Sequence, residues 1–104
     1  NINRPPIGWS EYVANKAYLL SLSKSWATEN IKFNISSNAI SPGFMLTSLT
    51  ADTDERIVEQ MTEAHPLKKL LTTKEVADTV AFYTRCSQQI NGTNLVINAG
   101  NDLQ

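Results

Sequence analysis

The stretch SEYVANKAYLLSLSKSWATENIKFNISSNAISPG, residues 10–43, decides the fold. Between Ser10 and Phe33 it contains neither proline nor glycine, and its apolar residues recur at intervals of three and four, which predicts one long helix. The residues that follow, Ile35–Ile40, predict a short strand that Ser41-Pro42-Gly43 terminates. A long amphipathic helix that leads directly into a strand is typical of α/β folds.

Two apolar stripes run along the predicted helix. One stripe contains Val13, Ala17, Leu20, Ala27 and Ile31, and the other contains Leu19, Leu22 and Trp26. Because two stripes need burial on two sides, we expect the helix to pack against a sheet and against another helix.

Two shorter helices are predicted in the second half of the chain. Asp52 opens the first, with Glu55 three residues later as in a capping box. The second runs from Thr73 to about Thr84. It is preceded by the same pattern, in which Thr72 is followed by Glu75.

Leu95–Ile97 predicts a last strand that is apolar on both faces, as buried parallel strands are. The predicted order is therefore helix, strand, helix, helix, strand. Two strands alone do not make a stable sheet. We therefore expect residues 1–104 to be a single partial domain, part of a larger α/β domain whose missing portion lies on the N-terminal side.

Composition excludes several classes of function. Nine basic residues against ten acidic ones give a net charge of −1, which provides no attraction to nucleic acid or to an anionic membrane. A single cysteine, Cys86, excludes an internal disulfide, and a single histidine, His65, argues against a histidine-rich metal site or a hydrolase triad. No secretory signal is visible, so a cytoplasmic location is expected.

The four glycines are too far apart to form a phosphate-binding loop. They stand at positions 8, 43, 92 and 100, and none lies within three residues of another.

Tyr12 and Lys16 are the most informative polar pair. Four residues apart on a helix, they lie on the same face. At about 5 Å and an effective dielectric of about 20, the ammonium attracts a phenolate by about 3 kcal/mol, which favours proton exchange by the tyrosine. An ordinary surface pair is the alternative interpretation.

The pair, the long helix and the segment Asn38-Ala39-Ile40-Ser41-Pro42-Gly43 with Thr47 together resemble the classical short-chain dehydrogenases/reductases. The resemblance continues through Pro66-Leu67, Glu75-Val76-Ala77 and Asn91-Gly92, and so covers essentially the whole chain. It implies the C-terminal half of a Rossmann-like, doubly wound parallel sheet, without the N-terminal half.

The resemblance also implies roles for individual residues. Tyr12 is expected to be the acid/base that exchanges a proton with a carbonyl or alcohol oxygen of a small-molecule substrate. Lys16 is expected to assist Tyr12 and to bind the ribose of NAD or NADP. The remaining residues implied to face the nicotinamide are Pro42, Gly43, Met45 and Thr47.

Residues 48–71 match the segment that covers the substrate in this family. Phe44, Leu49 and Met61 are expected to line an apolar substrate wall, although Met61 is equally compatible with a plain core position.

Some family features are missing from this chain. The glycine-rich cofactor turn, the catalytic serine and the catalytic asparagine have no counterpart, so the cofactor site is incomplete and the chain alone is expected to be inactive. Ser37 stands at a strand position that is usually apolar, and Ala99 replaces the first of two terminal glycines.

Two functions remain open. The first is the catalytic C-terminal half of an NAD(P)-dependent oxidoreductase that interconverts a carbonyl and an alcohol. The second is a truncated, inactive relative that serves as an interaction module. Helix 10–33 commonly forms a four-helix interface in this family, so a homodimer or homotetramer through that helix is expected in either case.

Overall fold

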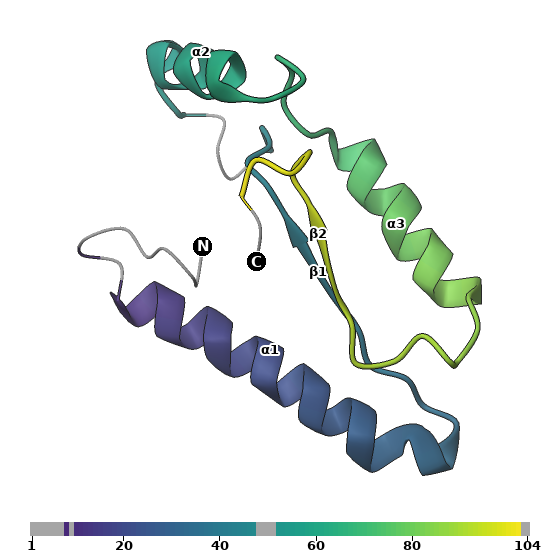
Figure 1. Cartoon of the computed structure of the whole chain (residues 1–104). Helices are drawn as coiled ribbons and strands as arrows, with labels where there is room; N and C mark the ends of the chain where they lie inside the picture. Colours follow the sequence, from purple (N-terminus) through teal and green to yellow (C-terminus); the bar gives the residue numbers. More distant parts are fainter. Residues whose placement is uncertain (1–7, 9, 48–51, 103–104) are drawn as a thin grey trace. The chain divides into compact units, whose positions relative to one another are not determined.

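Figure 1 shows the computed structural model of the chain, which describes residue 8, residues 10–47 and residues 52–102. The described elements are helix α1 (Ser10–Asn30), the 3-10 turn η1 (Ile31–Phe33), strand β1 (Ala39–Pro42), helix α2 (Glu55–Ala64), helix α3 (Thr73–Arg85) and strand β2 (Asn94–Ile97). This order confirms the predicted α/β class and the sequence of helices and strands.

Strands β1 and β2 lie side by side and form a two-stranded sheet (Figure 1). The backbone N–H of Ala39 donates to the carbonyl of Thr93 at 2.9 Å, and that of Gly43 donates to Ile97 at 2.8 Å. Both partners advance by four residues in the same direction, so the strands are parallel. Their carboxyl ends therefore lie at the same edge of the sheet.

The chain divides into two compact units. One unit contains Asn1–Ile40 with Arg85–Leu95, and the other contains Ser41–Thr84 with Val96–Leu103.

In the first unit, the amide of Asn91 joins α1 to the segment that precedes β1. Its Nδ2 donates to the carbonyl of Ala27 at 2.9 Å, and its Oδ1 accepts from the backbone N–H of Ser37 at 2.9 Å. Ala27 is the one buried hydrophobic residue among those described, at 4% exposure. The centre of this unit is thus the contact between the C-terminal part of α1 and the Asn91-Gly92 turn.

The predicted strand bounds were wrong, because β1 covers Ala39–Pro42 rather than residues 35–40. Ser37 and Asn38 bond instead to the loop before β2: Asn38 Oδ1 accepts from both the backbone and the hydroxyl of Thr93. Donors to β2 are found at positions 39 and 43, so by the two-residue alternation the missing N–H of Pro42 falls on the opposite side. Proline therefore does not end the strand where the sequence indicated.

The end of α1 follows the prediction closely. The α-helix stops at Asn30, and η1 tightens the final turn as far as Phe33. Asn34 then adopts the left-handed conformation, with φ of 62°, and donates its N–H to the carbonyl of Ile31. Asparagine tolerates this conformation better than most residues do, so Asn34 can end the helix.

The N-cap of helix α2 lies two residues after the predicted one. Asp54, rather than Asp52, is the N-cap, and its carboxylate accepts from the backbone N–H of Arg56 at 2.8 Å. The prediction failed because two aspartates compete for one role, and the residue immediately before the helix is the one that reaches its free amides.

Helix α3 is opened by the predicted capping box. The backbone N–H of Glu75 donates to the hydroxyl of Thr72 at 3.2 Å, and the carboxylate of Glu75 accepts from the backbone N–H of Thr72 at 3.0 Å. The same carboxylate accepts from the Thr72 hydroxyl at 2.9 Å. The hydrogen bonds from Thr72 hold the pKa of Glu75 below its usual value. The bond from the backbone N–H of Thr72 contributes most to this lowering.

Several large apolar side chains of the described residues are exposed. They include Leu19 and Trp26 on α1, at 55% and 50%, and Leu95 on β2 at 40%. The expectation that β2 is buried on both faces is therefore not met at Leu95.

Within the described ranges, no helix has both the length and the hydropathy that crossing a bilayer requires.

Candidate functional site

Helix α1 places Tyr12 and Lys16 together, as their spacing predicts. The Nζ of Lys16 lies 5.6 Å from the centroid of the Tyr12 ring. Both side chains are exposed, Tyr12 at 49%. A phenol and an ammonium group are therefore both accessible on one face of α1, one helical turn apart.

The chemistry of these two side chains fits the ribose end of a nicotinamide dinucleotide. The phenolic hydroxyl both donates and accepts a hydrogen bond, and the ammonium carries three donors for hydroxyl oxygens. An electrostatic attraction also acts between the ammonium and the aromatic face. The donor set that the sequence predicted is therefore present in one place.

The segment after β1 belongs to the second unit. Pro42 is the exposed last residue of β1, and Gly43, Met45 and Thr47 follow as half-buried residues. A Cβ on Gly43 would lie 3.0 Å from Cβ of Asn98, so this position has room for glycine only unless its neighbour moves. Leu49, the remaining predicted wall residue, lies outside the described residues.

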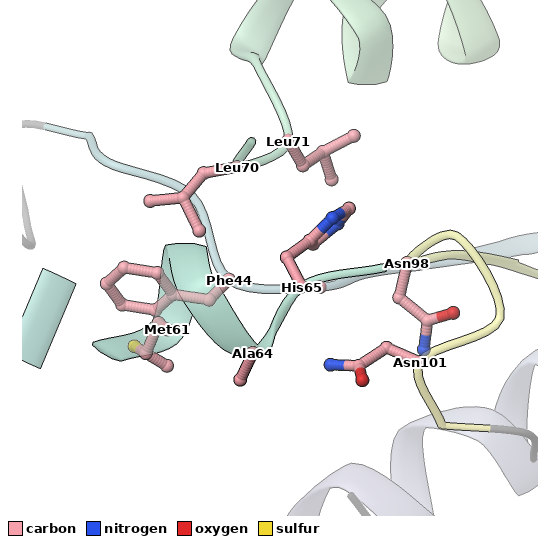
Figure 2. Close-up of a pocket in the computed structure, with 9 residues that line it drawn as sticks. Phe44, Met61, Ala64, His65, Leu70, Leu71, Asn98 and Asn101 are labelled. Carbon is pink, nitrogen blue, oxygen red and sulfur yellow. The ribbon is translucent and has the colours of Figure 1, made fainter. Parts of the chain in front are cut away.

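A hollow in the second unit brings Phe44 and Met61 together (Figure 2). Gly43 also lines it. We call it the α2 hollow. It has a volume of about 140 Å³ and is lined by Gly43, Phe44, Met61, Ala64, His65, Leu70, Leu71, Asn98 and Asn101. Two residues of the predicted apolar wall, Phe44 and Met61, thus line one cavity. Met61 is 37% exposed and therefore does not lie in a sealed core among the described residues.

Polar groups in the α2 hollow come mainly from the turn after β2. Asn98 is held in place, since its Oδ1 accepts from the N–H of Gly100 at 3.0 Å and its Nδ2 donates to the carbonyl of Asp102 at 2.8 Å. The amide of Asn101 also lines the hollow (Figure 2). His65 caps the end of α2, and its Nδ1 accepts from the N–H of Leu67 at 2.9 Å, as expected for a helix-end residue.

Several lining residues were not predicted. Ala64 was recognisable, because it continues the apolar face of α2 one turn after Met61. Asn98 was also recognisable, because ligands of open α/β sheets bind beyond the carboxyl ends of the strands. Leu70 and Leu71 carry no periodic signal, since they lie in the irregular connection before α3.

The predicted site residues thus form two sets, one in each unit. Tyr12 and Lys16 make up the first, and Gly43, Phe44 and Met61 meet in the second. Within the described ranges, no cluster of three His, Cys, Asp or Glu side chains is arranged to hold a metal ion.

Comparison with known proteins gives the family. Residues 7–102 match the family described as enoyl-(acyl carrier protein) reductase, which has the short-chain dehydrogenase/reductase architecture. The chain belongs to the short-chain dehydrogenase/reductase family. The match includes α1 with Tyr12 and Lys16, the segment after β1 and every residue of the α2 hollow.

Named short-chain dehydrogenase/reductase relatives support the same assignment. The chain is 34% identical over 94 residues to 3-oxoacyl-[acyl-carrier-protein] reductase of Staphylococcus epidermidis, which covers 89% of this chain and 38% of the relative. It is 33% identical over 95 residues to human (3R)-3-hydroxyacyl-CoA dehydrogenase, and the match covers 90% of this chain and 36% of the relative. It is 39% identical over 98 residues to carbonyl reductase family member 4 of Xenopus tropicalis, and the match covers 94% of this chain and 40% of the relative. The chain therefore spans about two-fifths of the length of these relatives.

Proposed function

We propose that this chain supplies the proton-transfer groups of an NAD(P)-dependent oxidoreductase that interconverts a carbonyl and an alcohol. The observation that carries the proposal is the ammonium of Lys16 held 5.6 Å from the ring of Tyr12, one turn away on α1. Membership of the short-chain dehydrogenase/reductase family supports it, and so do the oxidoreductase names of the relatives.

Tyr12 is the proposed acid/base. During reduction its hydroxyl donates a proton to the carbonyl oxygen of the substrate, and during oxidation it accepts the proton of the alcohol. Lys16 is proposed to assist Tyr12, since its ammonium lies beside the Tyr12 ring on the same helix.

The cofactor is proposed to be NAD or NADP. When bound, the nicotinamide supplies or accepts the hydride. Lys16 would hold the ribose hydroxyls, and the residues assigned to the nicotinamide itself are Pro42, Gly43, Met45 and Thr47. The sequence contains no glycine-rich turn. We therefore propose that groups outside these 104 residues bind the pyrophosphate of the cofactor.

The names of two relatives indicate the substrate class. One acts on a 3-oxoacyl chain carried by a protein, and the other on a 3-hydroxyacyl chain carried by coenzyme A. We therefore propose a 3-oxoacyl or 3-hydroxyacyl thioester as the substrate of this protein.

The test is Tyr12→Phe in the protein at its full native length. Removing one acid/base group is expected to lower kcat for carbonyl reduction by a factor of about 100 to 10,000. Nucleotide affinity, measured by calorimetry, is expected to change little because the ring and Lys16 remain. Tyr18→Phe, on the same helix, is the matched control and should retain full turnover. Undiminished reduction by the Tyr12→Phe protein would refute the assigned role.

A second candidate function is association through α1. The exposure of Leu19 and Trp26, which share one stripe of the helix with Leu22, favours it. We propose that this stripe joins copies of the protein into a homodimer or homotetramer. Association through α1 is compatible with oxidoreductase activity. If the protein lacks turnover, association is the function that remains.

A further inference from the structure

We infer that Asn91-Gly92 is a site of spontaneous deamidation, that the folded first unit protects it, and that its conversion prevents the turn from closing again. Asn91 is the only asparagine in the sequence that is followed by glycine. Because glycine has no side chain, its backbone nitrogen is the least hindered nucleophile that can follow an asparagine. The inference is independent of the proposed function.

The reaction needs only the chain itself and water. The backbone nitrogen of Gly92 loses its proton and attacks Cγ of Asn91, so a C–N bond forms and closes a cyclic imide. The bond from Cγ to the side-chain nitrogen breaks, and that nitrogen takes up the proton and leaves as ammonia. Water then opens the imide at either of its carbonyls. The product is aspartate, or isoaspartate in which the main chain passes through the former side chain.

The folded unit holds both reacting groups in hydrogen bonds. The Nδ2 of Asn91 donates to the carbonyl of Ala27 at 2.9 Å, and its Oδ1 accepts from the N–H of Ser37 at 2.9 Å, so the amide cannot turn freely. The attacking N–H of Gly92 donates to the carbonyl of Ser37 at 2.8 Å. The imide can therefore form only after these bonds have broken.

Helix α1 also covers the turn. A Cβ added to Gly92 would lie 3.5 Å from Cβ of Ala27, and Ala27 is only 4% exposed. The residue before the turn is held as well, because Nδ2 of Asn38 donates to the carbonyl of Ile90 at 3.1 Å. Deamidation of the folded protein is thus limited by the fraction of molecules in which this contact is open.

Conversion removes the group that fastens the turn to α1. An asparagine amide donates and accepts hydrogen bonds, whereas an ionised carboxylate only accepts them. The carbonyl of Ala27 would lose its donor and face a carboxylate oxygen instead. In isoaspartate the longer main chain also displaces the N–H of Gly92 from the carbonyl of Ser37. A single opening event can therefore become a permanent loss of the contact.

The first experiment follows Asn91 in the full-length protein at neutral pH, both folded and unfolded in guanidinium chloride. Samples are digested with pepsin in acid, and mass spectrometry distinguishes the amide, the aspartate and the isoaspartate. We expect conversion to be slower in the folded protein by a factor of at least about 10. Equal rates in the two states would overturn the protection, and an amide that persists in the unfolded chain would overturn the site.

A pair of variants tests whether the contact with α1 provides the protection. Ala27→Glu places a charge in the buried contact and is expected to raise the rate of conversion towards that of the unfolded chain. Thr28→Glu adds the same charge at the exposed neighbouring position and should keep the parent's rate. An Ala27→Glu protein that is folded and converts at the parent's rate would refute a protective role of α1. The comparison of the folded and unfolded parent decides the inference even if this variant does not fold.

The consequence of conversion is tested with Asn91→Asp, which reproduces one product. We expect the equilibrium constant for folding, measured by urea unfolding of the full-length protein, to fall by a factor of about 5 to 30. Asn101→Asp adds the same charge at an exposed position and should unfold at close to the parent's urea midpoint. An Asn91→Asp protein as stable as the parent would contradict the claim that conversion keeps the turn open.

Discussion

At the scale of single residues, the amide of Asn91 connects two segments of the first unit. It satisfies the carbonyl of Ala27 in α1 and the N–H of Ser37 before β1, and both bonds are partly buried. The next residue, Gly92, donates its N–H to the carbonyl of Ser37 at 2.8 Å. One turn thus fastens the helix that carries Tyr12 to the segment that leads into the sheet.

We predict that Asn91→Ala destabilises the full-length protein by about 2–4 kcal/mol. The reason is that two backbone groups lose their partner, at about 1–3 kcal/mol for each unsatisfied buried group, and the lower part of that range applies because both bonds are only partly buried. Urea unfolding followed by circular dichroism measures the change. Asn101→Ala removes an exposed amide of the same kind and should stay within about 0.5 kcal/mol of the parent. An equal effect of both substitutions would contradict the importance of the Asn91 bonds.

At the scale of elements, the start of α3 depends on Thr72 and Glu75 together. Thr72→Ala removes the hydroxyl that accepts from the N–H of Glu75, and we expect a loss of about 1 kcal/mol in the free energy of unfolding. The matched substitution Thr73→Ala, on the adjacent helical residue, should have a smaller effect because Thr73 is not the cap. Thermal unfolding at neutral pH compares the two variants.

The same cap has a defined pH dependence. The hydrogen bonds from Thr72 lower the pKa of Glu75 in the folded protein, so this group binds fewer protons when folded than when unfolded. Its stabilising contribution is complete above the unfolded pKa and is lost as the pH falls through the lowered folded pKa. Glu75→Gln should therefore weaken the acid dependence of unfolding, whereas Glu55→Gln, whose position is not part of this box, should leave that dependence closer to the parent's.

The elements also show how far sequence could predict this protein. Helix positions and the Thr72–Glu75 cap followed from local patterns, because periodicity and caps depend on residues within one or two turns. The bounds of β1 did not, because Ser37 and Asn38 are held by Asn91 and Thr93, more than fifty residues away. The Tyr12–Lys16 pair was predictable from its helical spacing. The α2 hollow was predictable only in part, because Leu70 and Asn98 enter it from irregular connections.

At the scale of the whole molecule, the exposed apolar surface is the dominant feature. Fourteen large apolar side chains of the described residues are exposed, and one small one, Ala27, is buried. A two-stranded sheet with this much apolar exposure is marginal in water, so stability requires further burial. We therefore expect contacts beyond those of the described residues to contribute to the stability of this fold.

The stripe of Leu19, Leu22 and Trp26 is where we expect copies of the protein to meet. Full burial of a large apolar side chain contributes about 1.5–3 kcal/mol, and a two-fold interface uses the same stripe from both copies. A charge at its centre would remain desolvated and unpaired. We therefore predict that Leu19→Glu combined with Trp26→Glu converts the full-length protein from a dimer or tetramer to a smaller species, measured by light scattering during gel filtration.

The matched control places the same two charges on the other side of the helix. At 100° per residue, Ser21 and Thr28 lie about 130° and 150° from the centre of the stripe, and both are exposed. Ser21→Glu with Thr28→Glu, which have the same spacing as the two stripe substitutions, should leave the mass of the assembly unchanged. A monomeric parent protein, or an assembly that survives the charged stripe, would exclude α1 as the interface. Loss of assembly with turnover retained would instead separate association from catalysis, since Tyr12 and Lys16 remain intact in this variant.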